Sequence, residues 1–360
     1  MTTTTCRITG ITCTFALSLT GCYSLGPKSM THDRYQYAAS LSDSWNEQTL
    51  LNIVKMRYVD PPSFVDVGNI VASYSLQQGL AVGGSMVHGG TIGNSATLSA
   101  SGVLTTSPTI TYNPLIGNKF IRNLATPIPP EQIFLSIQSG LPADVILFAS
   151  LAWINGLKNQ EATLDGITPA DPRFHRMRAL AKAIQQSGAQ RIVVRRESDE
   201  ELATFMTLPT EHASPQILAE IAEFRQLLGL DPDATEYRIV NGTTASNGRE
   251  IAVVSRSILG LMRTMAAQVE VPAEDLVQTR AFPGFEQERD VPGIVRLIRI
   301  HSGKSLPADV LVNVRYRNTW FWLDDSDLES KQAFALIMML FTMIDTGTPQ
   351  NQPVLTIPAH

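Results

Sequence analysis

A 52-residue segment without a single charged side chain is the feature that most restricts how this chain can fold. Residues 67–118 contain no Asp, Glu, Lys or Arg, although 17% of the 360 residues are charged and about nine would be expected there. The segment is rich in Gly, Ser and Thr, a composition that flexible linkers share. The order of its residues, however, follows a regular pattern that a linker does not need.

The segment alternates between apolar positions and small or polar positions. From Ile70 onward the even-numbered residues are mainly apolar, and the odd-numbered residues are mainly Ser, Gln, Gly or Ala. This is the two-residue period of a β-strand. After a turn-rich stretch at 88–94 the same parity resumes and continues to Tyr112. The pattern predicts a long β-hairpin with one apolar and one polar face.

Neither face of this hairpin carries the charges that soluble strands use to meet water and to guard their edges. Transmembrane β-strands alternate apolar and polar residues, need about 9–11 residues to span the bilayer and place aromatic residues near its interfaces. A charge on the lipid-facing side would cost about 2–4 kcal/mol near the midplane. We therefore predict that the apolar face contacts lipid, through Tyr74, Leu76, Leu80, Val82, Met86, Leu98, Leu104, Ile110 and Tyr112.

Two strands cannot span a bilayer alone, because their outer N–H and C=O groups would lack partners in hydrocarbon. A shared transmembrane β-barrel in an oligomer would need about four subunits for eight strands and about eight subunits for a conducting barrel. Two other interpretations stay open: a long arm packed on a neighbouring subunit, and a flexible or locally folded loop. Pro108 cannot donate to a strand ladder, so it predicts a bulge or an edge in the second strand.

The N-terminus has the layout of a secretory signal peptide. Residues 1–21 contain no acidic residue and one basic residue, Arg7, which is followed by a mostly apolar run. The run ends in Leu19-Thr20-Gly21-Cys22, which resembles the lipobox of bacterial lipoproteins. The resemblance implies cleavage after Gly21 and a covalent lipid on Cys22. Apart from this lipid, we expect no cofactor.

The other cysteines agree with this interpretation, because Cys6 and Cys13 would leave with the signal peptide and no free thiol would remain in an oxidising periplasm. Tyr23 stands where an Asp would retain a lipoprotein in the inner membrane of enteric bacteria, so the resemblance implies an outer-membrane protein with its body in the periplasm. Several acyl chains would anchor it stably. The lipobox and the hairpin together resemble the architecture of oligomeric lipoprotein secretion channels such as the curli secretion channel.

The predicted organisation has four parts: a signal peptide at 1–21, a lipid anchor and helical leader at 22–62, a projecting hairpin at 63–118, and a periplasmic α+β body at 119–360 that could subdivide near 209–215. In the leader we predict a helix from Tyr35 to Met56, with a capping box at Ser44 and Glu47. In the body we predict helices at 130–139, 142–157, 172–187, 214–228, 256–269 and 326–345, and strands at 190–196, 236–241, 249–254, 294–301, 309–316 and 319–324.

No motif in the body identifies an enzyme. The sequence lacks G-x-S-x-G, H-E-x-x-H and a glycine-rich phosphate loop. One acidic group could hold a hard cation, because such ions prefer several carboxylates. Ser326 and Glu329, however, have the spacing of a helix capping box, and this interpretation is preferred, so that no metal is expected. The acidic group consists of Asp324, Asp325, Asp327 and Glu329.

Trp320 and Trp322 share one face of a predicted strand and could form an interaction surface for a ligand or a neighbouring subunit, although packing in a core or interface is the commoner role.

The net charge of −5 argues against a polybasic nucleic-acid binder. Beyond the N-terminus no run of 18 uncharged apolar residues exists, which excludes a polytopic helical membrane protein.

The predicted function is export or transport across the outer membrane by a homo-oligomeric ring or channel, without enzymatic activity. Its partners would be outer-membrane lipid, further copies of the chain and envelope or secretion-machinery proteins, with no nucleic acid. The main alternative is a non-conducting accessory lipoprotein of an envelope-spanning complex, with the hairpin as an interlocking arm. The third hypothesis is a periplasmic hydrolase.

Overall fold

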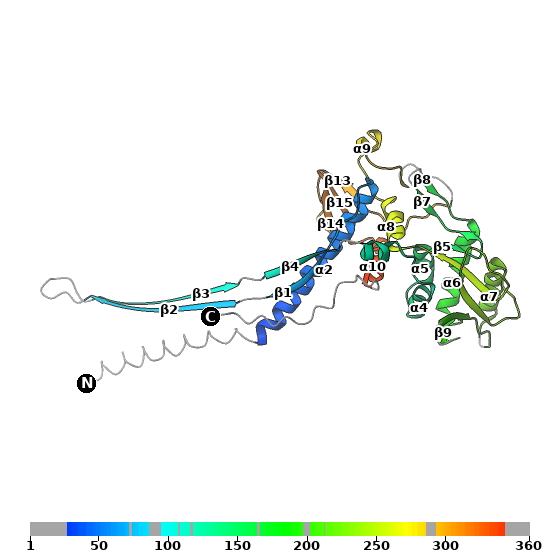
Figure 1. The fold of residues 1–360 in the computed structure, drawn as a ribbon, viewed down its shortest axis with the longest axis horizontal. Helices are drawn as coiled ribbons and strands as arrows, with labels where there is room; N and C mark the ends of the chain where they lie inside the picture. Colours follow the sequence, from blue (N-terminus) through cyan, green and yellow to red (C-terminus); the bar gives the residue numbers. More distant parts are fainter. Residues whose placement is uncertain are drawn as a thin grey trace. The chain divides into compact units, whose positions relative to one another are not determined.

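The structure is a computed structural model that describes residues 27–71, 74–85, 95–106, 109–115, 118–163, 166–196, 202–211, 213–285 and 293–342. Residue contacts divide the chain into two units. The main unit contains residues 27–62 and 121–342 of the described chain, and the hairpin unit contains residues 63–120. Helices and strands are both abundant, so the predicted mixed α+β class is confirmed (Figure 1).

Helix α2 (Pro27–Arg57) is longer than the helix predicted for the leader. Near its end Leu50, Ile53 and Val54 are completely buried, and their spacing places them on one helix face. By contrast, residues 38–44 are exposed. The predicted capping box at 44–47 is wrong, because these positions lie inside the helix. The predicted stop is confirmed, since α2 ends before the Asp60-Pro61-Pro62 sequence.

The main unit contains a six-stranded sheet with the strand order β6 (Leu157–Lys158), β5 (Leu151–Ile154), β12 (Glu250–Ser255), β11 (Glu236–Asn241), β10 (Leu202–Thr207) and β9 (Arg191–Arg196). Its neighbouring strands are antiparallel except β11 and β12, which are parallel. Four helices gather beside this sheet, namely α4 (Pro130–Gln138), α5 (Ala143–Ser150), α6 (Pro172–Gln186) and α7 (Pro215–Leu228) (Figure 1).

A second sheet of the main unit has the strand order β13 (His301–Gly303), β15 (Thr319–Asp324) and β14 (Val310–Tyr316). Its buried face carries Val312, Val314, Phe321 and Leu323. Helix α2 contacts β14, helix α10 (Leu328–Thr342) contacts β15, and both helices contact the buried helix α8 (Ile258–Ala266). The remaining elements of this unit are α9 (Ala273–Val277) and the pair β7 (Glu161–Thr163) and β8 (Gly166–Thr168).

The hairpin unit consists of antiparallel strand pairs. Strand β1 (Phe64–Val71) pairs with β4 (Thr109–Leu115), and β2 (Tyr74–Ser85) pairs with β3 (Ser95–Thr106). Helix α3 (Asn118–Ala125) follows β4. The two antiparallel runs that the alternation predicts are therefore present, the first in β1 and β2 and the second in β3 and β4.

The predicted helix at 142–157 is wrong beyond Ser150. Helix α5 ends there, and the following residues form β5, which pairs with β12. Asn155 and Gly156 then adopt positive φ values of 41° and 79° in the turn to β6. Asn followed by Gly is the sequence that such a turn favours. This dipeptide indicated a turn at 155–156. The helix was nevertheless predicted through it, because an apolar run does not distinguish a buried helix from a buried strand.

The predicted strand at 294–301 is also wrong, because β13 begins only at its last residue. Two buried glutamines take the place of a neighbouring strand. The side-chain oxygen of Gln160 accepts a hydrogen bond from the Val295 N–H at 2.7 Å, and that of Gln268 accepts from the Leu297 N–H at 2.5 Å. Buried backbone groups need partners, but side chains distant in sequence can supply them.

The other predicted helices and strands of the body are present, with small shifts at their ends. Besides β5 and β6, five further elements of the described chain were not predicted: α3, β7, β8, β10 and α9. We predicted that the body could divide into two parts near 209–215. This connection joins β10 to α7, and both lie within the main unit.

Candidate functional site

The pairing of β2 with β3 places even-numbered positions of one strand opposite even-numbered positions of the other, and these are the mainly apolar positions. Leu76 pairs with Leu104, and Val82 pairs with Leu98. Directly paired positions of an antiparallel ladder lie on the same face of the ribbon, so the even-numbered positions of both strands share one face. The other predicted lipid-facing positions in this pair of strands follow the same register, with Tyr74 opposite Thr106 and Leu80 opposite Ala100.

A register shift interrupts the ribbon in β1. Ile70 pairs with Ile110 and Val67 pairs with Tyr112, so that Gly68 and the following Asn lie opposite the single residue Thr111. An extra residue of this kind is a β-bulge, which reverses the parity of the strand beyond it. The bulge was not predicted, although a Gly inside a strand pattern is a signal for one. The bulge or edge predicted at Pro108 lies outside the described residues.

The end of the uncharged ribbon is marked by an exposed aromatic residue. The Tyr112 side chain is 63% exposed and Ile110 is 39% exposed, so the predicted apolar face is open to solvent at these positions. Asp66, the last charged residue before the uncharged segment, pairs with Asn113. Exposed apolar side chains that lie together mark a surface for contact with lipid or with another protein.

Within the described residues, each strand of the ribbon has a strand neighbour on one side only, since β1–β4 and β2–β3 are both two-stranded sheets. An isolated two-stranded ribbon is marginally stable in water. Its outer edges are templates for pairing with another strand. The ribbon can therefore gain stability by adding strands from another chain or by burying its apolar face. Two predicted site residues, Cys22 and Met86, lie outside the described residues.

On the main unit, a polar cluster holds the chain where it leaves α2. The Tyr58 hydroxyl donates to Asp275 Oδ2 at 2.8 Å, and Arg317 donates to Asp60 Oδ2 at 2.9 Å. The Tyr316 hydroxyl also donates to Asp60. Burial and the hydrogen bond to Asp275 raise the pKa of Tyr58 far above its ordinary value, so its hydroxyl stays a donor at physiological pH. This cluster fixes the chain just before the hairpin unit.

Trp320 and Trp322 are half-buried on one face of the second sheet, opposite the buried face. The imidazole of His301 stacks on Trp322, with 5.7 Å between ring centroids. The Arg315 guanidinium lies over Trp320, 5.8 Å from the ring centroid. Neighbours on the same sheet thus cover part of both indole rings, and the remainder is exposed.

The predicted acidic group caps helix α10, but through a different residue from the one predicted. Asp327 is the residue before the helix, and its carboxylate accepts hydrogen bonds from the Ser330 N–H at 3.1 Å and the Ser330 hydroxyl at 2.8 Å. Asp324 accepts from the Ser326 N–H at 2.9 Å. The capping box predicted at 326–329 is therefore wrong, because the Ser326 hydroxyl donates to Asp324 and the helix is capped by the Asp327 side chain. Lys331 forms an ion pair with Asp325 at 2.6 Å.

We expect Asp327→Ala to lower the free energy of unfolding by about 1 kcal/mol at pH 7, the usual contribution of an N-cap. Burial alone would raise the pKa of Asp327, but the hydrogen bonds from Ser330 and the charge of Arg299 lower it below its ordinary value. A lowered pKa means that the unfolded chain binds the proton more tightly. The contribution is thus complete above about pH 4 and is lost as the pH falls through the folded-state pKa.

Urea unfolding of the wild type and the variant at several pH values would measure this difference. The stability difference between the two proteins should shrink below about pH 4. Glu329→Ala serves as the control, because this residue was the predicted capping partner and makes no capping hydrogen bond with Ser326. A larger loss for Glu329→Ala than for Asp327→Ala would contradict the assignment.

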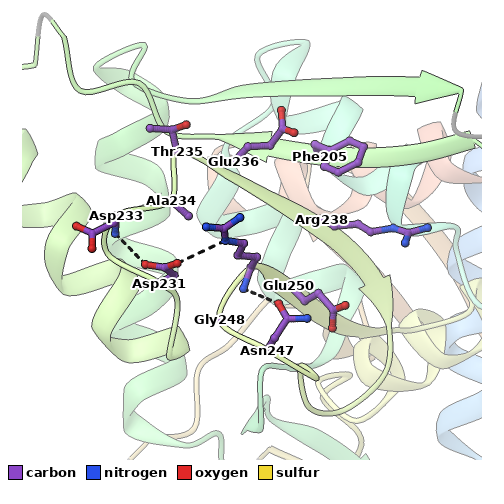
Figure 2. Close-up of a pocket in the computed structure, with 11 residues that line it drawn as sticks. Phe205, Asp231, Asp233, Ala234, Thr235, Glu236, Arg238, Asn247, Gly248 and Glu250 are labelled. Atoms are coloured by element: carbon purple, nitrogen blue, oxygen red, sulfur yellow. Dashed lines mark hydrogen bonds and ion pairs between the residues drawn. The ribbon is translucent and has the colours of Figure 1, made fainter.

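A wide depression of about 750 Å³ on the main unit is lined by charged residues that contact one another (Figure 2). The Arg249 N–H donates to Asn247 Oδ1 at 2.8 Å, and its guanidinium approaches Asp231 at 3.5 Å. Glu236 forms an ion pair with Arg195 at 2.6 Å. The lining residues are mainly charged or polar and include no Ser, Cys, His or Lys.

No protein-family model matches the chain, and no curated protein and no solved structure matches it either. Among the residues that the structure describes, no helix has both the length and the apolar character needed to cross a bilayer. Within the same residues, no group of three or more His, Cys, Asp or Glu side chains is placed to hold a metal ion.

Proposed function

We propose that the chain is an outer-membrane lipoprotein, anchored through Cys22, whose ribbons pair edge to edge between copies to form a ring or channel for passive export. The observation that carries this proposal is the uncharged two-stranded ribbon, whose register keeps its apolar positions on one face. Such a ribbon has edges for a neighbouring copy and a face suited to lipid. No enzymatic step is part of the proposed function.

The length of the described strands supports the proposal. Strands β2 and β3 contain 12 residues each. At about 3.3 Å per residue they extend about 40 Å, and a tilt of about 45° leaves about 28 Å along the membrane normal. This is close to the hydrocarbon thickness of about 30 Å. The pairing of β2 with β3 continues in the same register into β1 and β4, with Tyr74 opposite Thr106 and Val71 opposite Thr109. The ribbon is therefore longer than a bilayer needs, and part of it would project beyond the membrane.

The alternative function is a non-conducting accessory lipoprotein, and one observation favours it. The odd-numbered positions of the ribbon are as free of charge as the even-numbered ones. A water-filled lumen gives no reason to exclude charge from that face. An arm that is buried on both faces between neighbouring proteins would exclude charge from both.

The experiment that tests the proposal compares the mass and shape of the native protein, extracted in detergent, with those of a variant lacking residues 67–118. Light scattering with negative-stain imaging gives both quantities. We expect rings for the wild type and monomers for the deletion variant, because the deleted residues supply the edges that join the copies. A monodisperse monomer in both samples would favour the accessory lipoprotein.

A further inference from the structure

A cavity of about 280 Å³ lies at the first turn of helix α8, and three of its lining residues are cationic. Lys158 comes from β6, Arg256 from the connection between β12 and α8, and Arg263 from the middle of α8. Glu161 is the one carboxylate among the lining residues. Three cations and one anion leave an excess of two positive charges around the cavity.

The three cations are compensated to different degrees. Lys158 forms an ion pair with Glu161 at 3.0 Å. Arg256 donates to the backbone carbonyls of Phe148 at 2.8 Å and Ala149 at 3.0 Å, which are neutral acceptors. Arg263 is exposed and forms no ion pair with a carboxylate in the described part of the chain. Arg256 also donates to the Gln160 carbonyl. Neither arginine forms an ion pair with a carboxylate of the described residues, although the charge of Glu161 acts on Arg256 from nearby.

The environment of Arg256 also favours an anion. Burial lowers the pKa of its guanidinium to about 10, although the charge of Glu161 raises it and the charge of Arg263 lowers it. Burial and the repulsion from Arg263 penalise the charged form, which nevertheless predominates at neutral pH. An anion between the two guanidinium groups would relieve their repulsion and form charge-assisted hydrogen bonds.

A second depression, of about 420 Å³, adjoins the first and is mainly apolar; its one carboxylate, Asp60, forms an ion pair with Arg317 at 2.9 Å. The two share Ser257, Gly260 and Arg263, so that Arg263 lies at their common border. Val59, which lines the second depression, is 62% exposed although it is apolar. The apolar lining residues of this depression are Met56, Val59, Pro61, Pro62, Leu259 and Phe282.

The lining residues include both connections to the hairpin unit. Pro61 and Pro62 precede that unit in the chain, and Ala125 and Pro127 come soon after it. A cationic cavity beside an apolar groove matches a lipid, whose phosphate is anionic and whose acyl chains are apolar.

We infer that these two depressions bind an anionic phospholipid, with its phosphate among Lys158, Arg256 and Arg263 and the start of its acyl chains in the groove lined by Val59 and Leu259. The inference rests on the proposed function only for the source of the lipid, which would be the outer membrane. The binding chemistry itself rests on the charges and the apolar lining of the main unit.

The test is calorimetric titration of the full-length protein in a non-ionic detergent at a fixed salt concentration of about 0.1 M. The probes are short-chain phosphatidylglycerol, short-chain phosphatidylcholine and inorganic phosphate. We expect the wild type to bind phosphatidylglycerol most tightly. Arg263→Gln and Lys158→Gln should each weaken that binding about tenfold, the effect of losing one charge-assisted contact. Both positions are partly exposed, so folding should be preserved.

Arg249→Gln is the matched control, because Arg249 is an exposed arginine of the main unit that lines neither depression. It should bind phosphatidylglycerol like the wild type. Equally tight binding of inorganic phosphate would overturn the lipid assignment in favour of a free anion, and equal affinity in Arg263→Gln and the wild type would overturn the site. Light scattering on the same samples separates the two proposals: rings without selective lipid binding refute only this inference, and lipid binding by a monomer refutes only the ring.

Discussion

Val82→Arg is expected to abolish the detergent-stable rings of the full-length protein. Val82 pairs with Leu98 on the face that both strands share, three residues before the end of β2. A cation on the lipid-facing side of a membrane strand costs up to about 2–4 kcal/mol, less toward the interfaces, and every copy in the ring would carry this cost. Light scattering of the detergent-extracted protein would measure the loss, and membrane fractionation would show whether the ribbon still inserts.

Ser99→Arg is the matched control for this substitution. Ser99 is the chain neighbour of Leu98 and pairs with Ala81, so it lies at the same level of the ribbon on the opposite face. A barrel would place this face toward the lumen, where an arginine is tolerated, and rings should persist. Loss of assembly in both variants would point to an arm buried on both faces. Assembly retained in both would contradict insertion of the ribbon.

Gly284→Ala should lower the free energy of unfolding by about 3 kcal/mol or more, as overpacking of a close-packed core does. A Cβ atom at this position would lie 2.5 Å from the Ala267 carbonyl oxygen and would collide with the guanidinium of Arg57. Neither group can easily move. The Ala267 carbonyl accepts the Phe285 N–H at 2.9 Å, and the Arg57 side chain is fully buried against the ring of Phe282.

Gly242→Ala provides the comparison for this prediction, because a Cβ there would meet its nearest neighbours at 3.7 and 3.8 Å, which is ordinary contact. We expect it to change the unfolding free energy by no more than about 0.5 kcal/mol. Urea unfolding followed by tryptophan fluorescence would compare the two variants. Equal unfolding midpoints would show that the backbone near Gly284 can shift, and would contradict the close packing described for Arg57.

Local pattern was sufficient to predict the hairpin ribbon and most of the helices. The two-residue alternation predicted which positions of β2 and β3 share a face, because a strand places every second residue on the same side whatever its partner is. Helix α7 follows the same logic, since Ser214 caps it through the Ile217 N–H and Gly229 ends it with a φ of 65°. These features depend on residues that are neighbours in the chain.

Elements whose backbone partners are distant in sequence could not be predicted in this way. The segment 294–300 has the composition of a strand, but Gln160 and Gln268 satisfy its backbone from positions far away in the chain. The polar cluster at Asp60 joins residues separated by more than 250 positions. The bulge at Gly68 had a local signal, but its effect on pairing with Tyr112 depended on the partner strand.

The same distinction between local and long-range features applies to the candidate site. The uncharged ribbon and the resemblance of residues 19–22 to a lipobox follow from the order of residues alone, because charge, apolar alternation and motif spacing are properties of a continuous segment. The cationic cavity with its apolar groove could not, because it unites residues from β6, α8, the end of α2 and the segment after α3. No local pattern contains such a surface: long-range packing brings its charges together, and that packing is set by the burial of apolar residues throughout the main unit.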